Sequence, residues 1–118
     1  MKILPPTLRE KKRYLAVEII GEGRISRDRF LRALQDSITD LFGDIGISEA
    51  GLRLLHFDGT LAVVRCTPRM MWAVRAGIAA ITRIDGVRVA ARVIGIGGTV
   101  RSVMEKYVES DLNQTLNT

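Results

Sequence analysis

Few side chains in this sequence have the type and spacing that catalysis needs. His56 is the only histidine and Cys66 the only cysteine, and they fall on two neighbouring predicted strands. A lone histidine on a strand is more often packed or solvated than catalytic, and an isolated cysteine more often fills a core. One cysteine also excludes a disulfide framework and a multi-cysteine metal site. We therefore predict no catalytic residue and no metal ligands in this chain.

An arginine in the segment GEGRISRDRF, residues 21–30, allows a second kind of chemistry. Acylphosphatase-like enzymes hold a phosphate with an arginine between their first strand and first helix, which is the position of Arg24. These enzymes also need an asparagine to orient the attacking water. The only asparagines are Asn113 and Asn117, in a polar tail. An acylphosphatase-like hydrolase is therefore the less favoured interpretation.

Positive charge is the third chemical feature, and it is unevenly distributed along the chain. The net charge is +5, with +4 over residues 1–13, −3 over 14–61, +5 over 62–100 and −1 over 101–118. Fourteen of the 18 basic residues are arginine, whose planar guanidinium can hold a phosphate through two hydrogen bonds. This segregation favours a polyanionic partner such as nucleic acid. A genomic bias in codon use would also explain the arginine content.

The hydrophobic pattern predicts how these side chains are positioned within one domain over 1–118. The predicted elements are a strand over 14–20, a helix over 26–43, strands over 52–57 and 60–67, a helix over 68–84, a strand over 87–94 and a helix after Thr99. Asp58 and Gly59 predict a type I′ turn between the two middle strands. This order predicts an α+β class with a ferredoxin-like β-α-β-β-α-β sandwich, a four-stranded antiparallel sheet with helices on one face, plus a C-terminal helix.

The sequence divides into three parts by composition. They are a basic, proline-containing arm over 1–13, the ferredoxin-like core over 14–97, and a C-terminal helix with a polar tail over 98–118. No apolar run reaches the ~18 residues that a membrane span needs, and the N-terminus lacks the apolar segment of a signal peptide. We therefore expect a cytoplasmic protein without membrane contact. The predicted fold hosts many activities, so it does not by itself indicate a function.

Four segments carry a resemblance to a known family. They are LPPTLREKKRYLAVEI over 4–19, FDG over 57–59, VRC over 64–66 and GIGGTVR over 95–101. Together they resemble the archaeal ribonuclease P protein component 2 family, and the first segment is the most specific of the four. The sequence departs from the family pattern at Gly97, where a serine is usual, and in its tail, which is acidic and polar rather than basic.

The resemblance implies a function in which this chain is not itself catalytic. Ribonuclease P is a ribonucleoprotein endoribonuclease that removes the 5′ leader of precursor tRNA, and its RNA and bound Mg²⁺ perform the chemistry. The implied partners are the catalytic RNA, precursor tRNA in the assembled complex, protein component 3 and other protein subunits, and self-association stays open. No cofactor is expected on this chain. A stand-alone RNA-binding module and a small-ligand regulatory module of ferredoxin-like fold also stay open as functions.

RNA contact is expected from the arm, from the glycine-rich segment GIGGTVR and from the second face of the sheet, although that face is mixed enough to serve a protein instead. In the arm, two prolines hold the basic residues in an extended segment. Charges beside an edge strand can also serve only to prevent aggregation. In GIGGTVR, amides at a helix start can bind an anion, although the glycines also suit a tight turn. The residues expected to contact RNA are Arg9, Lys11, Lys12, Arg13, Arg65, Arg88, Arg92, Gly97, Gly98, Thr99 and Arg101.

A protein interface is expected on the second helix. Met71, Val74, Ile78 and Ile81 share one side of this helix and are predicted to face the core. The other side carries Arg69, Trp72, Ala76, Ala79 and Arg83. The small alanines allow close approach and the indole can anchor a partner, although the arginines or the terminal helix could instead cover Trp72.

Overall fold

The computed structural model describes residues 11–106 of the chain. The elements are β1 (Arg13–Gly21), α1 (Arg27–Ala50), β2 (Arg53–Phe57), β3 (Leu61–Cys66), the short 3-10 helix η2 (Pro68–Met70), α2 (Met71–Ala79), β4 (Arg83–Ile84) and β5 (Val87–Gly97). Residues 100–106 form a further helix, called the C-terminal helix below. The predicted α+β class is confirmed. In this described part of the chain, no helix is long and apolar enough to span a membrane.

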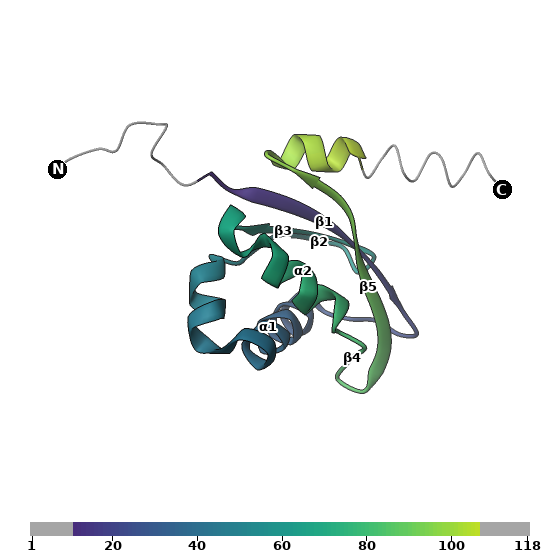
Figure 1. Cartoon of the computed structure of the whole chain (residues 1–118). Coiled ribbons are helices and arrows are strands. Elements are labelled where there is room, and N and C mark those ends of the chain that lie inside the picture. The colour runs from purple at the N-terminus through teal and green to yellow at the C-terminus, as the bar shows by residue number, and fades with distance from the viewer. Residues whose placement is uncertain (1–10, 107–118) are drawn as a thin grey trace.

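The strands form one antiparallel sheet in the order β2-β3-β1-β5-β4 (Figure 1). The prediction of four strands was wrong, because α2 ends at Ala79 and the segment predicted as its last turn forms β4. Asp85 and Gly86 both have positive φ, 50° and 80°, which is the geometry of a type I′ hairpin turn. The turn pairs Ile84 with Val87, and an ion pair of 2.7 Å between Arg29 Nε and Asp85 Oδ2 ties it to α1.

The hairpin of β2 and β3 is confirmed, but its predicted type I′ turn at Asp58–Gly59 was wrong. Only Gly59 has positive φ. The turn is instead organised by a side chain, because Asp58 Oδ1 accepts hydrogen bonds from the amides of Thr60 at 2.9 Å and Leu61 at 2.7 Å. A carboxylate in this position replaces the backbone geometry that a type I′ turn needs.

Helix α1 begins where the sequence predicts and continues beyond its predicted end. Ser26 Oγ accepts a hydrogen bond from the amide of Arg29 at 3.3 Å, as an N-cap does. The helix breaks at Gly43, where φ is 78° and ψ is 179°, and then resumes as far as Ala50. Glycine allows this conformation without strain. The predicted end of this helix at residue 43 is therefore wrong, and the resumed turns bury Ala50 in the core.

Helices α1 and α2 pack on one face of the sheet and form the main core with it (Figure 1). Leu15 and Val17 of β1 face Phe30, Leu34 and Ile38 of α1, and all five are fully buried. At Gly77 the two helices are in close contact, since a Cβ there would lie 2.6 Å from Ile38 Cγ1. Ser37 Oγ also donates a 2.7 Å hydrogen bond to the Gly77 carbonyl.

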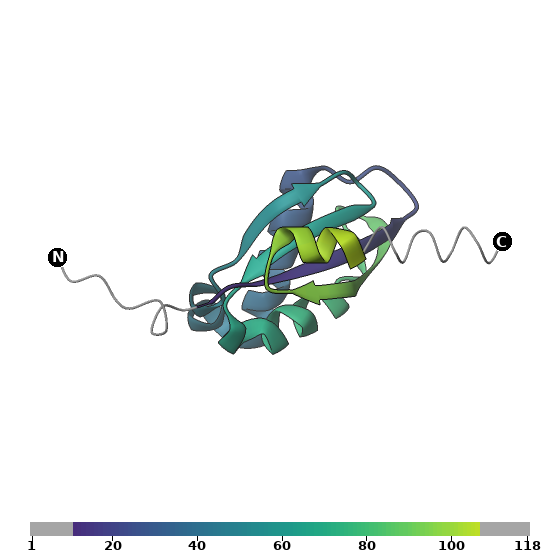
Figure 2. The ribbon, with the colours of Figure 1, turned by 90° about the horizontal axis from the view of Figure 1, so that it is seen from above.

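The opposite face of the sheet, called the outer face below, carries the C-terminal helix (Figure 2). Val103 of this helix is fully buried against Ala16 of β1 and Leu61 of β3. Tyr14, Ile94 and Met104 pack around this second, smaller cluster. Because Leu15, Ala16 and Val17 are all fully buried, the middle of β1 is covered on both faces.

The close contact at Gly77 leads to a stability prediction. Gly77→Ala should lower the free energy of unfolding by about 1 to 3 kcal/mol, because the new methyl forces Ile38 and α1 to move. In most helices the same change would stabilise the protein. Urea unfolding followed by circular dichroism measures the difference. Gly98→Ala is the control: its Cβ meets no atom within 4 Å, so we expect a change below about 0.5 kcal/mol. Equal stabilities of the two variants would contradict this packing argument.

The turn carboxylate leads to a prediction of pH dependence. Partial desolvation raises the pKa of Asp58, but hydrogen bonds from Thr60 and Leu61 outweigh it and lower the pKa from 3.8 to about 2. A lowered folded-state pKa stabilises the protein above pH 3.8, and this contribution is lost as the pH falls towards 2. Since the side chain is 48% exposed, solvent screening reduces the contribution to about 1 kcal/mol.

Asp58→Ala should therefore be less stable than the unaltered protein at pH 7 by about 1 kcal/mol. The difference should shrink between pH 4 and pH 2, because the native carboxylate is protonated over this range. Asp58→Asn keeps an acceptor oxygen and should lie between the two proteins at pH 7. Urea unfolding at both pH values is the measurement, and a difference that does not depend on pH would exclude the role assigned to the carboxylate.

Candidate nucleic-acid interface

The residues with catalytic potential are held in structural positions. Cys66 is fully buried, as predicted, and desolvation raises the pKa of its thiol to about 11. Its thiol is therefore protonated at neutral pH and a poor nucleophile. His56 Nε2 lies 3.4 Å from Asp58 Oδ2, beside the hairpin turn. Within residues 11–106, no three His, Cys, Asp or Glu side chains are grouped to hold a metal ion.

The described part of the basic arm lies at the start of β1. Arg13 is the first residue of that strand and pairs with Cys66 of β3. The Lys12 side chain lies beside the end of α1, with its Nζ 3.8 Å from the position of a Cβ on Gly51. A cation is favourable there because the helix dipole is negative at that end. Lys11 is exposed, and Arg9 lies outside the described residues.

The glycine-rich segment is more regular than predicted. Strand β5 extends to Gly97, which pairs with Tyr14 in the sheet. Thr99 Oγ1 accepts a 3.1 Å hydrogen bond from the amide of Ser102, so Thr99 caps the C-terminal helix. A Cβ on Gly97 would overlap the Ser102 hydroxyl. Close packing against the C-terminal helix therefore favours glycine at this position. Gly98 is exposed, and a Cβ there would have open space.

Two of the predicted RNA-binding arginines already have acidic partners. Arg92 Nη2 lies 3.2 Å from Glu18 Oε2, and Arg101 Nε lies 3.2 Å from Glu105 Oε1. These pairs are exposed and weak, so they reduce the local positive charge without blocking a contact. Arg88 is exposed on β5, directly opposite Arg83 of β4.

Strand pairing places several predicted RNA-binding residues at one end of the sheet. The register aligns Arg65 of β3 with Tyr14 of β1, and Tyr14 with Gly97 of β5. The same register aligns Arg65 with Arg53 of β2. This group, called the basic end below, comprises Lys11, Lys12, Arg13, Arg53 and Arg65. Arg88 and Arg92 lie towards the other end of β5, so the predicted set forms two groups.

The structure brings the predicted protein-interface residues together only in part. Trp72 is 60% exposed and packs edge to face on Phe42 of α1, with ring centroids 5.0 Å apart. The C-terminal helix lies on the other face of the sheet, so it does not cover this indole. Arg69 and Ala79 are exposed and Ala76 is half-buried, close to Trp72 in sequence. Arg83 was wrongly predicted on this helix, because it belongs to β4.

Apolar residues of α1 extend the surface around Trp72. Leu41 and Ile45 flank Phe42 in sequence at the break in α1, and both are exposed, Ile45 by 74%. We call Leu41, Phe42, Ile45 and Trp72 the Trp72 patch. Sequence reasoning missed the α1 part of the patch because the helix was predicted to end at residue 43, before Ile45. Exposed apolar clusters of this kind mark interaction surfaces.

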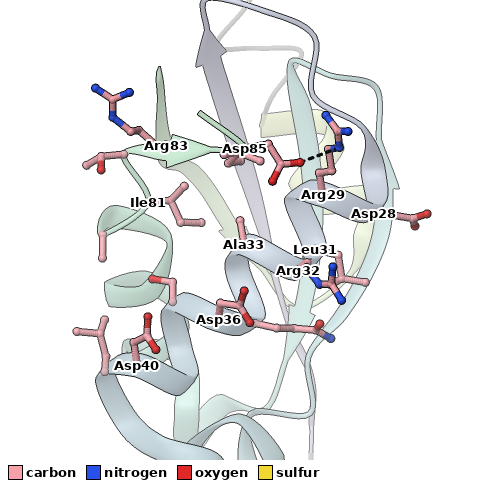
Figure 3. A pocket seen from close by; sticks show the side chains of 16 residues that line it. Asp28, Arg29, Leu31, Arg32, Ala33, Asp36, Asp40, Ile81, Arg83 and Asp85 are labelled. Atoms are coloured by element: carbon pink, nitrogen blue, oxygen red, sulfur yellow. Dashed lines mark ion pairs between the residues drawn. The ribbon is translucent and has the colours of Figure 1, made fainter. Parts of the chain in front are cut away.

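A groove lies between α1 and the segment around β4 (Figure 3). Its volume is about 920 Å³. Its charged lining residues are Asp28, Asp36, Asp40, Asp85, Arg29, Arg32 and Arg83. Charges of both signs line it, and Arg29 and Asp85 pair with each other. This mixed lining does not favour a phosphate ligand. The groove is therefore a less suitable site for RNA than the basic end.

Comparison with known proteins gives consistent matches over most of the chain. The model of the Rpp14/Pop5 family matches residues 13–108. A Methanosarcina mazei protein named ribonuclease P protein component 2 is 38% identical over 111 residues, covering 94% of this chain and 96% of that protein. The protein of the same name from Archaeoglobus fulgidus is 39% identical over 109 residues, covering 92% and 99% respectively.

A solved structure shares the fold. A chain in the cryo-EM structure of yeast ribonuclease MRP matches with a TM-score of 0.66, covering 93% of this chain and 98% of that chain. The two sequences are 14% identical, so this likeness concerns the fold.

Proposed function

Because the chain belongs to the Rpp14/Pop5 family, we propose that it is a protein subunit of ribonuclease P that supports the catalytic RNA in removing the 5′ leader of precursor tRNA. The observation that carries the proposal is the match, over nearly the whole length of both chains, to archaeal proteins named ribonuclease P protein component 2. In this proposal the RNA and its Mg²⁺ ions perform the hydrolysis. The chain contributes binding and positioning in the cytoplasm.

The arrangement of side chains supports a chain that binds and positions the RNA while the RNA performs the hydrolysis. The Cys66 thiol is buried and protonated, and His56 is held beside the turn carboxylate of Asp58. An acylphosphatase-like hydrolase is not favoured, because the described residues include no asparagine to orient a water. The arginines, by contrast, are presented on a rigid sheet, where backbone contacts can fix the register of an RNA.

In this proposal the core is a ferredoxin-like β-α-β-β-α-β unit with β4 added at one edge, and its two working surfaces are formed by different elements. The basic end would contact the RNA and the Trp72 patch would contact protein component 3. The Trp72 patch belongs to the helix-covered side of the sheet, whereas Arg53 and Arg65 belong to its outer face. One subunit could therefore join an RNA and a protein without competition between them.

Reconstitution tests the proposed function directly. Catalytic RNA is combined with all protein subunits, with or without this chain, and cleavage of precursor tRNA is measured at low Mg²⁺. We expect cleavage at the mature 5′ end and a rate that falls at least tenfold when the chain is omitted. A complex whose rate and Mg²⁺ requirement are the same without the chain would reject the proposal.

The arm should contribute to RNA affinity through phosphate contacts. Replacing Lys11, Lys12 and Arg13 by Ala should weaken binding and reduce the slope of log K against log salt by up to about 0.9 for each phosphate that the arm no longer neutralises. Filter binding or fluorescence anisotropy with the catalytic RNA, repeated at several KCl concentrations, gives the slope. The control is Arg24→Ala, an exposed arginine between β1 and α1. A slope equal to that of the control would rule out phosphate contact by the arm.

The Trp72 patch should become buried when component 3 binds. Trp72 is the only tryptophan, so 5-fluorotryptophan labelling gives one ¹⁹F resonance that should shift on adding component 3. Trp72→Ala should weaken that complex by about 2 kcal/mol, the cost typical of an interface anchor. Ile20→Ala is the control, because Ile20 is 57% exposed but lies on β1, away from the patch. An unchanged resonance at saturating component 3 would exclude this surface.

A further inference from the structure

An arginine pair on the outer face of the sheet places two like charges side by side. Arg53 of β2 and Arg65 of β3 are directly opposite each other in the antiparallel register. Directly opposite residues bring their side chains into contact range, and like charges in this position repel. Among the residues that the structure describes, neither arginine has an acidic partner within salt-bridge distance. The repulsion is therefore not offset by a carboxylate of residues 11–106.

Arg65 also holds a donor that is buried without a partner. Its Nε atom is shielded from solvent, and no hydrogen-bond acceptor in the described part of the chain reaches it. A buried charged donor without an acceptor is costly, and native structures rarely keep one without a reason. This burial concerns the Nε atom alone, and Arg65 as a whole is only partly buried. The pair with Arg53 concentrates positive charge beside it, and this charge favours an anion from outside the protein as a partner.

The neighbours of the pair fit a phosphodiester. Across the sheet, the row Arg53, Arg65, Tyr14 and Gly97 runs over four adjacent strands on the outer face. Tyr14, which the register aligns with Arg65, adds a phenol to this row. Glu18, the carboxylate on the same face of β1, is paired with Arg92 further along the strand. The row thus presents donors at the end of the sheet where β1 begins.

We propose that Arg53 and Arg65 together bind one phosphate group of an RNA backbone through the terminal nitrogens of their guanidinium groups. This inference rests on the proposed function, since it takes the RNA to be that of ribonuclease P. A phosphate suits the site because two guanidinium groups can share its oxygens and so neutralise their own repulsion. The basic arm residues Lys11, Lys12 and Arg13 lie at the same end, where the RNA backbone would continue.

The proposal predicts that affinity and stability change in opposite directions. Arg65→Met keeps the length of the aliphatic stem and removes the unpaired donor and the repulsion. The free variant should therefore melt higher than the unaltered protein at 20 mM KCl, by about 4 °C. The difference should decrease in 1 M KCl, where screening weakens the repulsion. A side chain that served only the fold would instead destabilise the protein when removed.

RNA binding is measured on the same variants. The double variant Arg53→Gln/Arg65→Met, in complex with component 3, should bind the catalytic RNA at least tenfold more weakly, with a salt slope reduced by about 0.9 for the one phosphate no longer neutralised. The control is Arg32→Met, an exposed arginine on α1, which should bind like the unaltered protein. In the free protein, the ¹H–¹⁵N resonance of Arg65 Nε should shift on titration with a short single-stranded RNA.

The outcomes separate the phosphate site from the subunit function. If the unaltered chain supports precursor tRNA cleavage but the double variant keeps the RNA affinity and salt slope of the control, the phosphate site is wrong and the subunit function stands. If the double variant loses component 3 but binds RNA normally, the arginines meet a protein carboxylate and the inference is overturned. If the unaltered chain supports no cleavage while its Arg65 resonance shifts with RNA, the subunit function fails and the site stands.

Discussion

The burial of β1 on both of its faces is the constraint on which the rest of the structure depends. Leu15 and Val17 face the two helices, and Ala16 between them is covered by Val103 of the C-terminal helix. The strand is also central in the sheet, with β3 on one side and β5 on the other. A strand buried in this way has one register, because a shift by one residue would exchange its two faces. The position of Arg13, which begins β1, is consequently fixed relative to the sheet.

This constraint explains how positive charge can be both concentrated and ordered. Arg13 starts the strand, and the same register that buries Leu15 aligns Tyr14 with Arg65 and Gly97. The basic end is thus positioned by hydrophobic packing rather than by salt bridges. Among residues 11–106, none of its side chains has an acidic partner within salt-bridge distance. The core, and not their charge, holds the strands that carry them. A protein that positions RNA needs this arrangement, since carboxylates that neutralised the arginines would also compete with phosphate.

The elements that could be predicted from the sequence are those whose signals are local. The Ser26 cap, the alternation along β1 and the hairpin of β2 and β3 follow from neighbouring residues. The features that were missed depend on distant ones. Strand β4 exists because the Asp85–Gly86 turn brings Ile84 to Val87 and because Asp85 pairs with Arg29 of α1. The turns of α1 after Gly43 remain helical because Ala50 enters the core, which no local pattern shows.

The candidate RNA-binding residues could likewise be predicted only in part, because their partners are distant in sequence. Positive charge in the arm and on the strands is visible in the sequence, but its effect depends on cross-strand partners. Arg92 and Arg65 look alike in sequence, each on a strand beside apolar residues. Pairing places Arg92 next to Glu18, whereas it places Arg65 next to Arg53. An arginine with a carboxylate beside it contributes little field, and one with another arginine beside it contributes more than either alone.

Arg92 and Arg65 therefore differ in how much free energy would be gained when a phosphate binds. At Arg92 an incoming phosphate would have to compete with Glu18, so little free energy would be gained. Among residues 11–106, Arg65 lies opposite Arg53 and has no carboxylate within salt-bridge distance, so a phosphate would offset the repulsion between the two arginines. Part of the free energy of binding would come from relieving an unfavourable arrangement already present in the free protein. The core formed around β1 is what makes that arrangement tolerable, because it keeps Arg53 and Arg65 together when no anion is bound.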